Sequence, residues 1–175
     1  DFTGATLIVG NTTAFNITSV KNSDFVVRGG KWLGVHANSK IIRNIPSQQK
    51  ENVFVFDVIS VDSISTSYLF ENTAPFYSTS KWVIKANSII SKNGYLFLGS
   101  GDIYLDWDVK YAYALLGGIV GSEWGSNFYY IHGTIETPSN INGISITAVS
   151  SAIIKGVFTK VSIGKRVLAY KNIYF

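Results

Sequence analysis

Apolar and polar residues alternate along several stretches of the chain, as they do in strands that bury one face. Over residues 102–110 every second side chain is apolar, which predicts a strand with one buried and one wet face. The apolar members are Ile103, Leu105, Trp107 and Val109. Residues 53–61 and 128–135 carry apolar side chains on both sides and predict strands that are covered on both faces. Further strands are predicted over residues 144–149, 153–163 and 166–175.

Helix signals are almost absent, because isoleucine and valine are abundant whereas leucine is scarce. A short helix within residues 111–116 is the one exception that the pattern allows. Asn93-Gly94 and Asn142-Gly143 are typical of hairpins or tight turns. Roughly nine to twelve short strands without a helix between them predict an all-β fold, a β-sandwich or jelly-roll-like domain.

The 175 residues and 19.2 kDa fit one domain. No linker divides the chain, and no internal repeat with a period of about 20–50 residues is visible. The composition changes only near the start, because residues 1–20 contain no Lys, Arg, Glu, Trp or Tyr. We therefore divide the chain into an N-terminal extension, residues 1–20, and a β-sandwich domain, residues 21–175.

The N-terminal extension contains an apolar segment, Phe2–Val9, that has the alternation of a strand. One side of the extended segment carries Thr3, Ala5, Leu7 and Val9. Such a strand has two possible uses. It pairs within its own sheet, or it leaves its subunit and completes the sheet of another copy by β-strand addition.

Composition indicates a secreted protein and excludes several classes of function. Cysteine is absent, which excludes disulfides and thiolate metal sites, and no apolar run reaches the ~20 residues of a membrane-spanning helix. The net charge of +4 is not gathered in a basic cluster, so no nucleic-acid partner is expected. A first residue that is not methionine suggests a mature chain cut after a signal peptide. Sequons at Asn11 and Asn16 predict N-linked glycans on an extracellular or cell-surface protein.

Two groups of residues are candidates for ligand binding. Asp102, Asp106 and Asp108 fall on one side of a predicted strand, where they form a calcium site or, as the plainer interpretation, a solvated strand face. Trp124 lies in a glycine-rich loop and is a candidate for stacking on a sugar, whereas Trp107 follows the apolar register of a core residue. No catalytic, metal or cofactor motif is present, so we expect neither an enzyme nor a cofactor.

In layout and composition over its whole length, the chain resembles the donor-strand filament subunits of archaea, the thread and bundling-pilus proteins. It resembles chaperone–usher pilins more distantly, since it lacks their cysteine pair. The resemblance implies a pilin-like fold whose N-terminal strand fills a groove in another copy. The donor residues would be Phe2, Thr3, Ala5, Leu7, Ile8 and Val9.

The function expected from this resemblance is structural. The chain would polymerise head to tail with copies of itself into a surface filament that serves adhesion or biofilm formation. Two alternatives remain open at this point: a carbohydrate-binding adhesin module that uses Trp124, and a viral capsid or spike jelly-roll.

Overall fold

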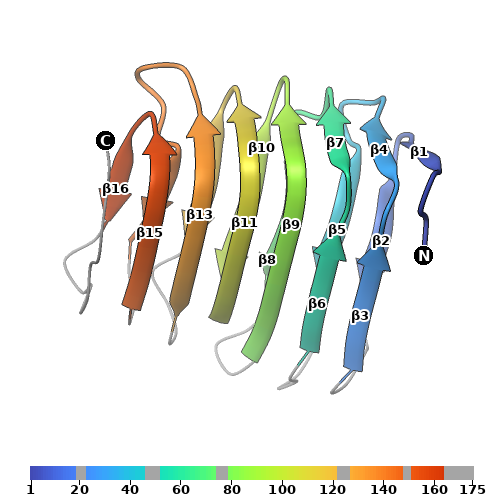
Figure 1. Cartoon of the computed structure of the whole chain (residues 1–175), viewed down its shortest axis with the longest axis horizontal. Coiled ribbons are helices and arrows are strands. Elements are labelled where there is room, and N and C mark those ends of the chain that lie inside the picture. Colours follow the sequence, from blue (N-terminus) through green and yellow to red (C-terminus); the bar gives the residue numbers. More distant parts are fainter. Residues whose placement is uncertain (19–22, 46–51, 74–78, 122–126, 148–150, 164–175) are drawn as a thin grey trace.

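A computed structural model describes residues 1–18, 23–45, 52–73, 79–121, 127–147 and 151–163. These residues form strands and their connections, and no helix occurs among them. The strands lie in two sheets that enclose an apolar interior (Figure 1).

The two sheets contain nine and seven strands and are called sheet A and sheet B. Sheet A contains β1 (Thr6–Val9), β3 (Ser23–Arg28), β4 (Lys31–Gly34), β6 (Asn52–Asp57), β7 (Ser60–Ser63), β9 (Thr79–Ser91), β11 (Asp102–Ala114), β13 (Phe128–Glu136) and β15 (Ser151–Phe158). Sheet B contains β2 (Thr13–Ile17), β5 (Lys40–Asn44), β8 (Tyr68–Thr73), β10 (Tyr95–Ser100), β12 (Gly117–Gly121), β14 (Ile144–Ile146) and β16 (Val161–Ile163).

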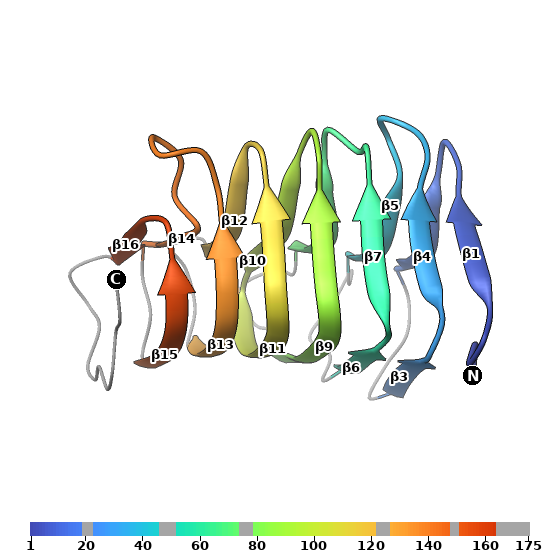
Figure 2. The ribbon, with the colours of Figure 1, turned by 45° about the horizontal axis from the view of Figure 1, so that its top comes forward.

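Every pairing between the described strands is parallel. Parallel neighbours need a long crossover, and here the connection between any two paired strands of sheet A includes a strand of sheet B. The chain therefore winds into a parallel β-solenoid of about five turns, and Figure 2 shows how the connections pass between the sheets. The all-β class is confirmed. The predicted β-sandwich or jelly-roll, pilin-like arrangement is wrong, because those folds rest on antiparallel strands.

The interior is built from rows of equivalent residues in successive turns. In a parallel sheet that is in register, each residue lies beside its equivalents in the neighbouring strands, and we call such a row a column. One interior column of sheet A contains Phe25, Phe54, Trp82, Leu105, Tyr129 and Ala152. Phe54 and Trp82 stack with their ring centroids 4.3 Å apart, and both are at most 1% exposed. Burial of such large side chains in every turn is the main stabilising contribution to the solenoid.

The side chains of sheet A alternate between this interior and an outer face. The prediction for residues 102–110 is confirmed, and Trp107 is fully buried. The prediction that residues 53–61 and 128–135 are covered on both faces is wrong, because the outward side chains of β6 and β13 remain partly exposed. Apolar residues occupy much of any protein surface, so their presence on both sides of a strand does not require two buried faces.

The connections between the sheets include the two predicted Asn-Gly turns. Asn93-Gly94 links β9 to β10, so it is a tight turn between sheets and not a hairpin. A Cβ atom at Gly94 would lie 2.5 Å from the carbonyl oxygen of Ser67 in the preceding turn of the solenoid, so only glycine fits there. The short helix predicted within residues 111–116 is absent, since this segment is the end of β11 and the turn into β12.

The long strands of sheet A change direction near their middle, where glycine allows close approach. Gly133 of β13 has a φ of 115°, and a Cβ atom there would lie 1.7 Å from the carbonyl oxygen of Val109. A Cβ atom at Gly156, in the next turn, would likewise lie 1.7 Å from the carbonyl oxygen of Gly133. The register between β11 and β13 shifts at the same level, between Val109 and Ala112. This irregularity is typical of a β-bulge, which bends a strand.

Buried polar residues in sheet B also lie beside polar groups of the neighbouring turns. The Asn44 side-chain amide donates to the side-chain oxygen of Asn72 over 2.7 Å, and the Asn72 amide donates to the carbonyl oxygen of Ser100 over 2.9 Å. Successive turns thus provide hydrogen-bond partners for amides that would be costly to bury alone.

The column model predicts that two phenylalanines in the same sheet have unequal effects on stability. Phe54 points inward and is 1% exposed, whereas Phe128 points outward and is partly exposed. We expect Phe54→Ala to lower the free energy of unfolding by about 3–5 kcal/mol, and Phe128→Ala to cost less than half as much. Urea denaturation of the two variants measures the difference. Equal losses would contradict the assignment of the two faces.

Candidate functional site

A column of charged side chains crosses the outer face of sheet A. The register of the strands brings together Arg28, Asp57, Lys85, Asp108, His132 and Lys155, one from each of six successive strands. Positive and negative charges alternate over the first four members. All six are at least partly exposed, so this charged column is accessible to a ligand.

One contact joins two members of the charged column among the described residues. Nδ1 of His132 lies 3.2 Å from Oδ1 of Asp108, which is hydrogen-bond distance, and the contact is an ion pair when the imidazole is protonated. Arg28, Asp57 and Lys85 make no ion pair with the described part of the chain. Asp108 is therefore already engaged, while the other charges of the column are available to an incoming group.

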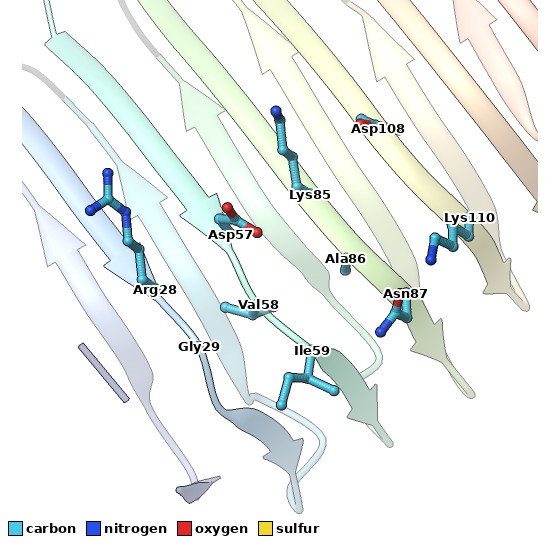
Figure 3. A pocket seen from close by; sticks show the side chains of 10 residues that line it. All are labelled: Arg28, Gly29, Asp57, Val58, Ile59, Lys85, Ala86, Asn87, Asp108 and Lys110. Carbon is cyan, nitrogen blue, oxygen red and sulfur yellow. The ribbon is translucent and has the colours of Figure 1, made fainter. Parts of the chain in front are cut away.

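A hollow of about 420 Å³ lies beside the charged column, where the strands change direction. Its lining consists of Arg28, Gly29, Asp57, Val58, Ile59, Lys85, Ala86, Asn87, Asp108 and Lys110. Figure 3 shows the charged side chains of Arg28, Asp57 and Lys85 next to the apolar side chains of Val58 and Ile59. The hollow thus combines an apolar surface with cations, carboxylates and one amide.

Three aromatic residues on the same outer face, Tyr104 in β11 and Phe128 and Tyr130 in β13, are called the aromatic row. The rings of Tyr104 and Phe128 are nearly parallel, with centroids 5.0 Å apart and an interplanar angle of 10°. The Lys81 ammonium lies 5.3 Å from the centroid of Tyr104, and the Lys155 ammonium lies 5.9 Å from that of Tyr130. The ring faces of Tyr104 are therefore occupied by neighbours within the chain, and the row offers mainly ring edges and hydroxyl groups to a ligand.

Asp106 lies between the aromatic row and the charged column. Partial burial raises the pKa of its carboxyl group above the usual value, and Asp108 adds to this rise. Lys85 acts in the opposite direction and is the strongest of the charges that favour the ionised form. The Asp106 carboxyl group and the Lys85 ammonium group therefore interact electrostatically across neighbouring strands.

The three aspartates proposed for calcium all lie in β11 and point to its outer side. Asp106 has Lys81 and Lys85 nearby, and Asp108 has His132. Among the residues that the structure describes, no three His, Cys, Asp or Glu side chains are grouped closely enough to hold a metal ion. The plainer interpretation, a solvated strand face, fits the geometry better.

Trp124, the residue expected to stack on a sugar, lies outside the described residues. The charged column and the hollow were missed at the sequence level, although the alternation over residues 102–110 already placed Asp106 and Asp108 on the wet face. What was missing is the pairing between strands, which brings Arg28, Asp57 and Lys85 beside them.

The segment Phe2–Val9, predicted as a donor strand, packs on its own chain. β1 pairs with β4, the ring of Phe2 meets Trp32 edge-on at 5.4 Å, and Val9 is 4% exposed. Ile8 points outward and is 70% exposed. β1 lies at the end of sheet A, so one of its edges has no partner among the described strands. Donation of this segment to another copy stays a prediction.

The two predicted glycosylation sites lie in the first turn. Asn11 precedes β2 and Asn16 lies within it, and both are exposed. The sequons are therefore accessible, and the presence of glycans and the extracellular location stay predictions.

Comparison with known proteins does not identify a family for this chain. The chain matches no protein-family model, no curated protein and no solved structure. In the part of the chain that the structure describes, no helix has the length and hydropathy needed to cross a membrane.

The electrostatic arrangement predicts a titration shift. We expect Lys85→Gln to raise the pKa of the Asp106 carboxyl group further, because the variant loses the charge that favours ionisation most strongly. An NMR titration of the side-chain carboxyl carbon measures this shift, with Lys160→Gln as a distant control. A lower or unchanged pKa in Lys85→Gln would show that the two groups do not interact.

Proposed function

We propose that the outer face of sheet A binds an acidic polysaccharide, which lies along the charged column and places carboxylates in the hollow. The observation that carries the proposal is the set of three cationic side chains around the hollow, Arg28, Lys85 and Lys110. None of the three forms an ion pair with a described residue.

The balance of charge in the hollow favours an anionic ligand. Asp57 and Asp108 also line the hollow. Three cations therefore face two carboxylates, and the hollow has a net positive charge. An anion that replaces water on these cations gains charge-assisted hydrogen bonds, which are stronger than neutral ones.

The carboxylates in the charged column favour a sugar polymer over a nucleic acid. A phosphate backbone offers acceptor oxygens only, so a strand along the column would bring phosphates close to Asp57 and Asp108 with no donor between them. Sugar hydroxyl groups, in contrast, donate hydrogen bonds to carboxylates and to the side-chain oxygen of Asn87. The side chain of Ile59 is 39% exposed, and its apolar surface suits the C–H face of a sugar ring.

The spacing of the cations indicates how a polymer would lie. Arg28 and Lys85 are separated by two strand spacings, which is about 9–10 Å. A chain that crosses the strands would place the carboxylates of alternate sugars near these cations and place hydroxyl groups near the intervening Asp57. The ligand would therefore run along the solenoid axis, perpendicular to the strands.

The filament expected from the sequence remains a second candidate. Its specific support is the edge of β1 at the first turn of sheet A, which has no partner among the described strands, since exposed strand edges are templates for pairing with another chain. Carbohydrate binding and self-assembly use different surfaces, so the two functions are compatible.

The proposal predicts binding to polygalacturonate and much weaker binding to its methyl ester, which has the same sugar without the charge. We expect Lys85→Gln to weaken binding of polygalacturonate about tenfold or more, because one charge-assisted hydrogen bond is lost. Affinity electrophoresis or calorimetry measures both ligands at fixed salt, with Lys160→Gln as a matched control of equal charge.

Three outcomes would contradict the proposal. They are equal affinity for the acid and its ester, equal losses in the two lysine variants, and tighter binding to single-stranded DNA than to the polysaccharide.

A further inference from the structure

Neighbouring strands of the hollow offer different pairs of side chains to the proposed polysaccharide. Residues two apart along an extended segment lie on the same face, roughly 7 Å from each other. On the outer face Ile59 follows Asp57, and Asn87 follows Lys85 (Figure 3). The two pairs are side by side, since Asp57 lies beside Lys85 and the Asn87 amide donates to the Ile59 carbonyl oxygen over 3.1 Å.

The first pair combines a hydrogen-bond acceptor with an apolar surface. Asp57 is exposed and forms no ion pair with a described residue, and Ile59 is 39% exposed. An ionised carboxylate only accepts hydrogen bonds, so Asp57 needs a donor from the ligand, whereas Ile59 needs an apolar group. An acetamido group provides both, because its N–H donates and its methyl group is apolar.

The second pair combines a cation with a side-chain amide. The Lys85 ammonium only donates, and the Asn87 amide both donates and accepts. A uronic acid matches this pair, since its carboxylate accepts from Lys85 and its hydroxyl groups exchange hydrogen bonds with Asn87. The sugar that fits β9 therefore differs in chemistry from the sugar that fits the segment containing Asp57 and Ile59.

The two kinds of position recur with a period of two strands. Cations occupy Arg28 and Lys85, and carboxylates occupy Asp57 and Asp108, each two strand spacings apart. One spacing is about 4.8 Å, which is close to the length that one sugar adds to an extended chain. Sugars of two kinds would therefore alternate along the charged column.

We infer that the ligand is an alternating polymer of a uronic acid and an N-acetylated hexosamine. The inference rests on the proposed function and names the class of polysaccharide. Uronic acids lie over Arg28 and Lys85, and the hexosamine between them donates its N–H to Asp57 and places its methyl group on Ile59. A polymer of uronic acid alone would bring a further carboxylate near Asp57, and these like charges repel.

Hexasaccharides of hyaluronan and of polygalacturonate test this inference on the whole chain. Hyaluronan alternates glucuronate with N-acetylglucosamine, whereas polygalacturonate carries a carboxylate on every sugar. We expect the hyaluronan fragment to bind about tenfold more tightly at physiological salt, although it has half the charge. Isothermal titration calorimetry measures both affinities.

Two matched variants locate the source of this preference. Asp57→Asn should abolish it, because a charge-assisted hydrogen bond becomes a weaker neutral one. Asp24→Asn removes an exposed carboxylate from the outer face at the other end of β3, and it should leave the preference unchanged.

A second measurement detects the acetamido group without relying on affinity. In saturation-transfer difference NMR, the N-acetyl methyl protons should be the most strongly saturated protons of the hyaluronan fragment. Ile59→Ser should reduce this signal, because the variant loses the apolar surface on which the methyl group lies.

The outcomes separate this inference from the proposed function. Equal or tighter binding of the polygalacturonate fragment, with both fragments weakened by Lys85→Gln, would overturn the inference and leave the proposed function standing. A preference for hyaluronan that survives Asp57→Asn, or a methyl signal that Ile59→Ser does not change, would also overturn it. Binding of neither fragment would overturn the inference and the proposed function together.

Discussion

The structure depends on one constraint, which is that each strand lies parallel to its equivalents in the neighbouring turns and in register with them. Under this constraint a residue is placed against the same position of the turns before and after it. Phe54 therefore stacks on Trp82, and Asn44 finds its hydrogen-bond partner in Asn72. Stability in such a solenoid is gained turn by turn, from contacts between nearest neighbours.

The same constraint creates the surface chemistry. Arg28, Asp57, Lys85 and Asp108 are far apart in the sequence, and the register places them in one row on the outer face. The bend in the long strands then hollows the face beside this row.

The sequence predicts the local structure well and the arrangement poorly, for physical reasons. The alternation over residues 102–110 is a property of one strand, so it identified β11 and the burial of Trp107 correctly. Whether two strands pair parallel or antiparallel depends on the connection between them. A connection that contains a further strand shows the same alternation of apolar and polar residues as the second strand of a hairpin, so this alternation does not distinguish the two arrangements. The turns also differ in length, so that Thr6, Lys31, Ser60, Ser88 and Tyr111 share a column at unequal spacings. This irregularity hides the repeat, and with it the charged column.

The most direct test of the parallel register is a set of distances along the charged column. The chain contains no cysteine, so two introduced cysteines carry spin labels at chosen positions without background. Arg28 is four strands from His132 and five from Lys155, which gives backbone separations of about 19 Å and 24 Å at the spacing of a β-sheet. Pulsed electron paramagnetic resonance on the two label pairs should show a difference of about one strand spacing, ~5 Å. Equal distances, or a shorter distance to position 155, would contradict the solenoid.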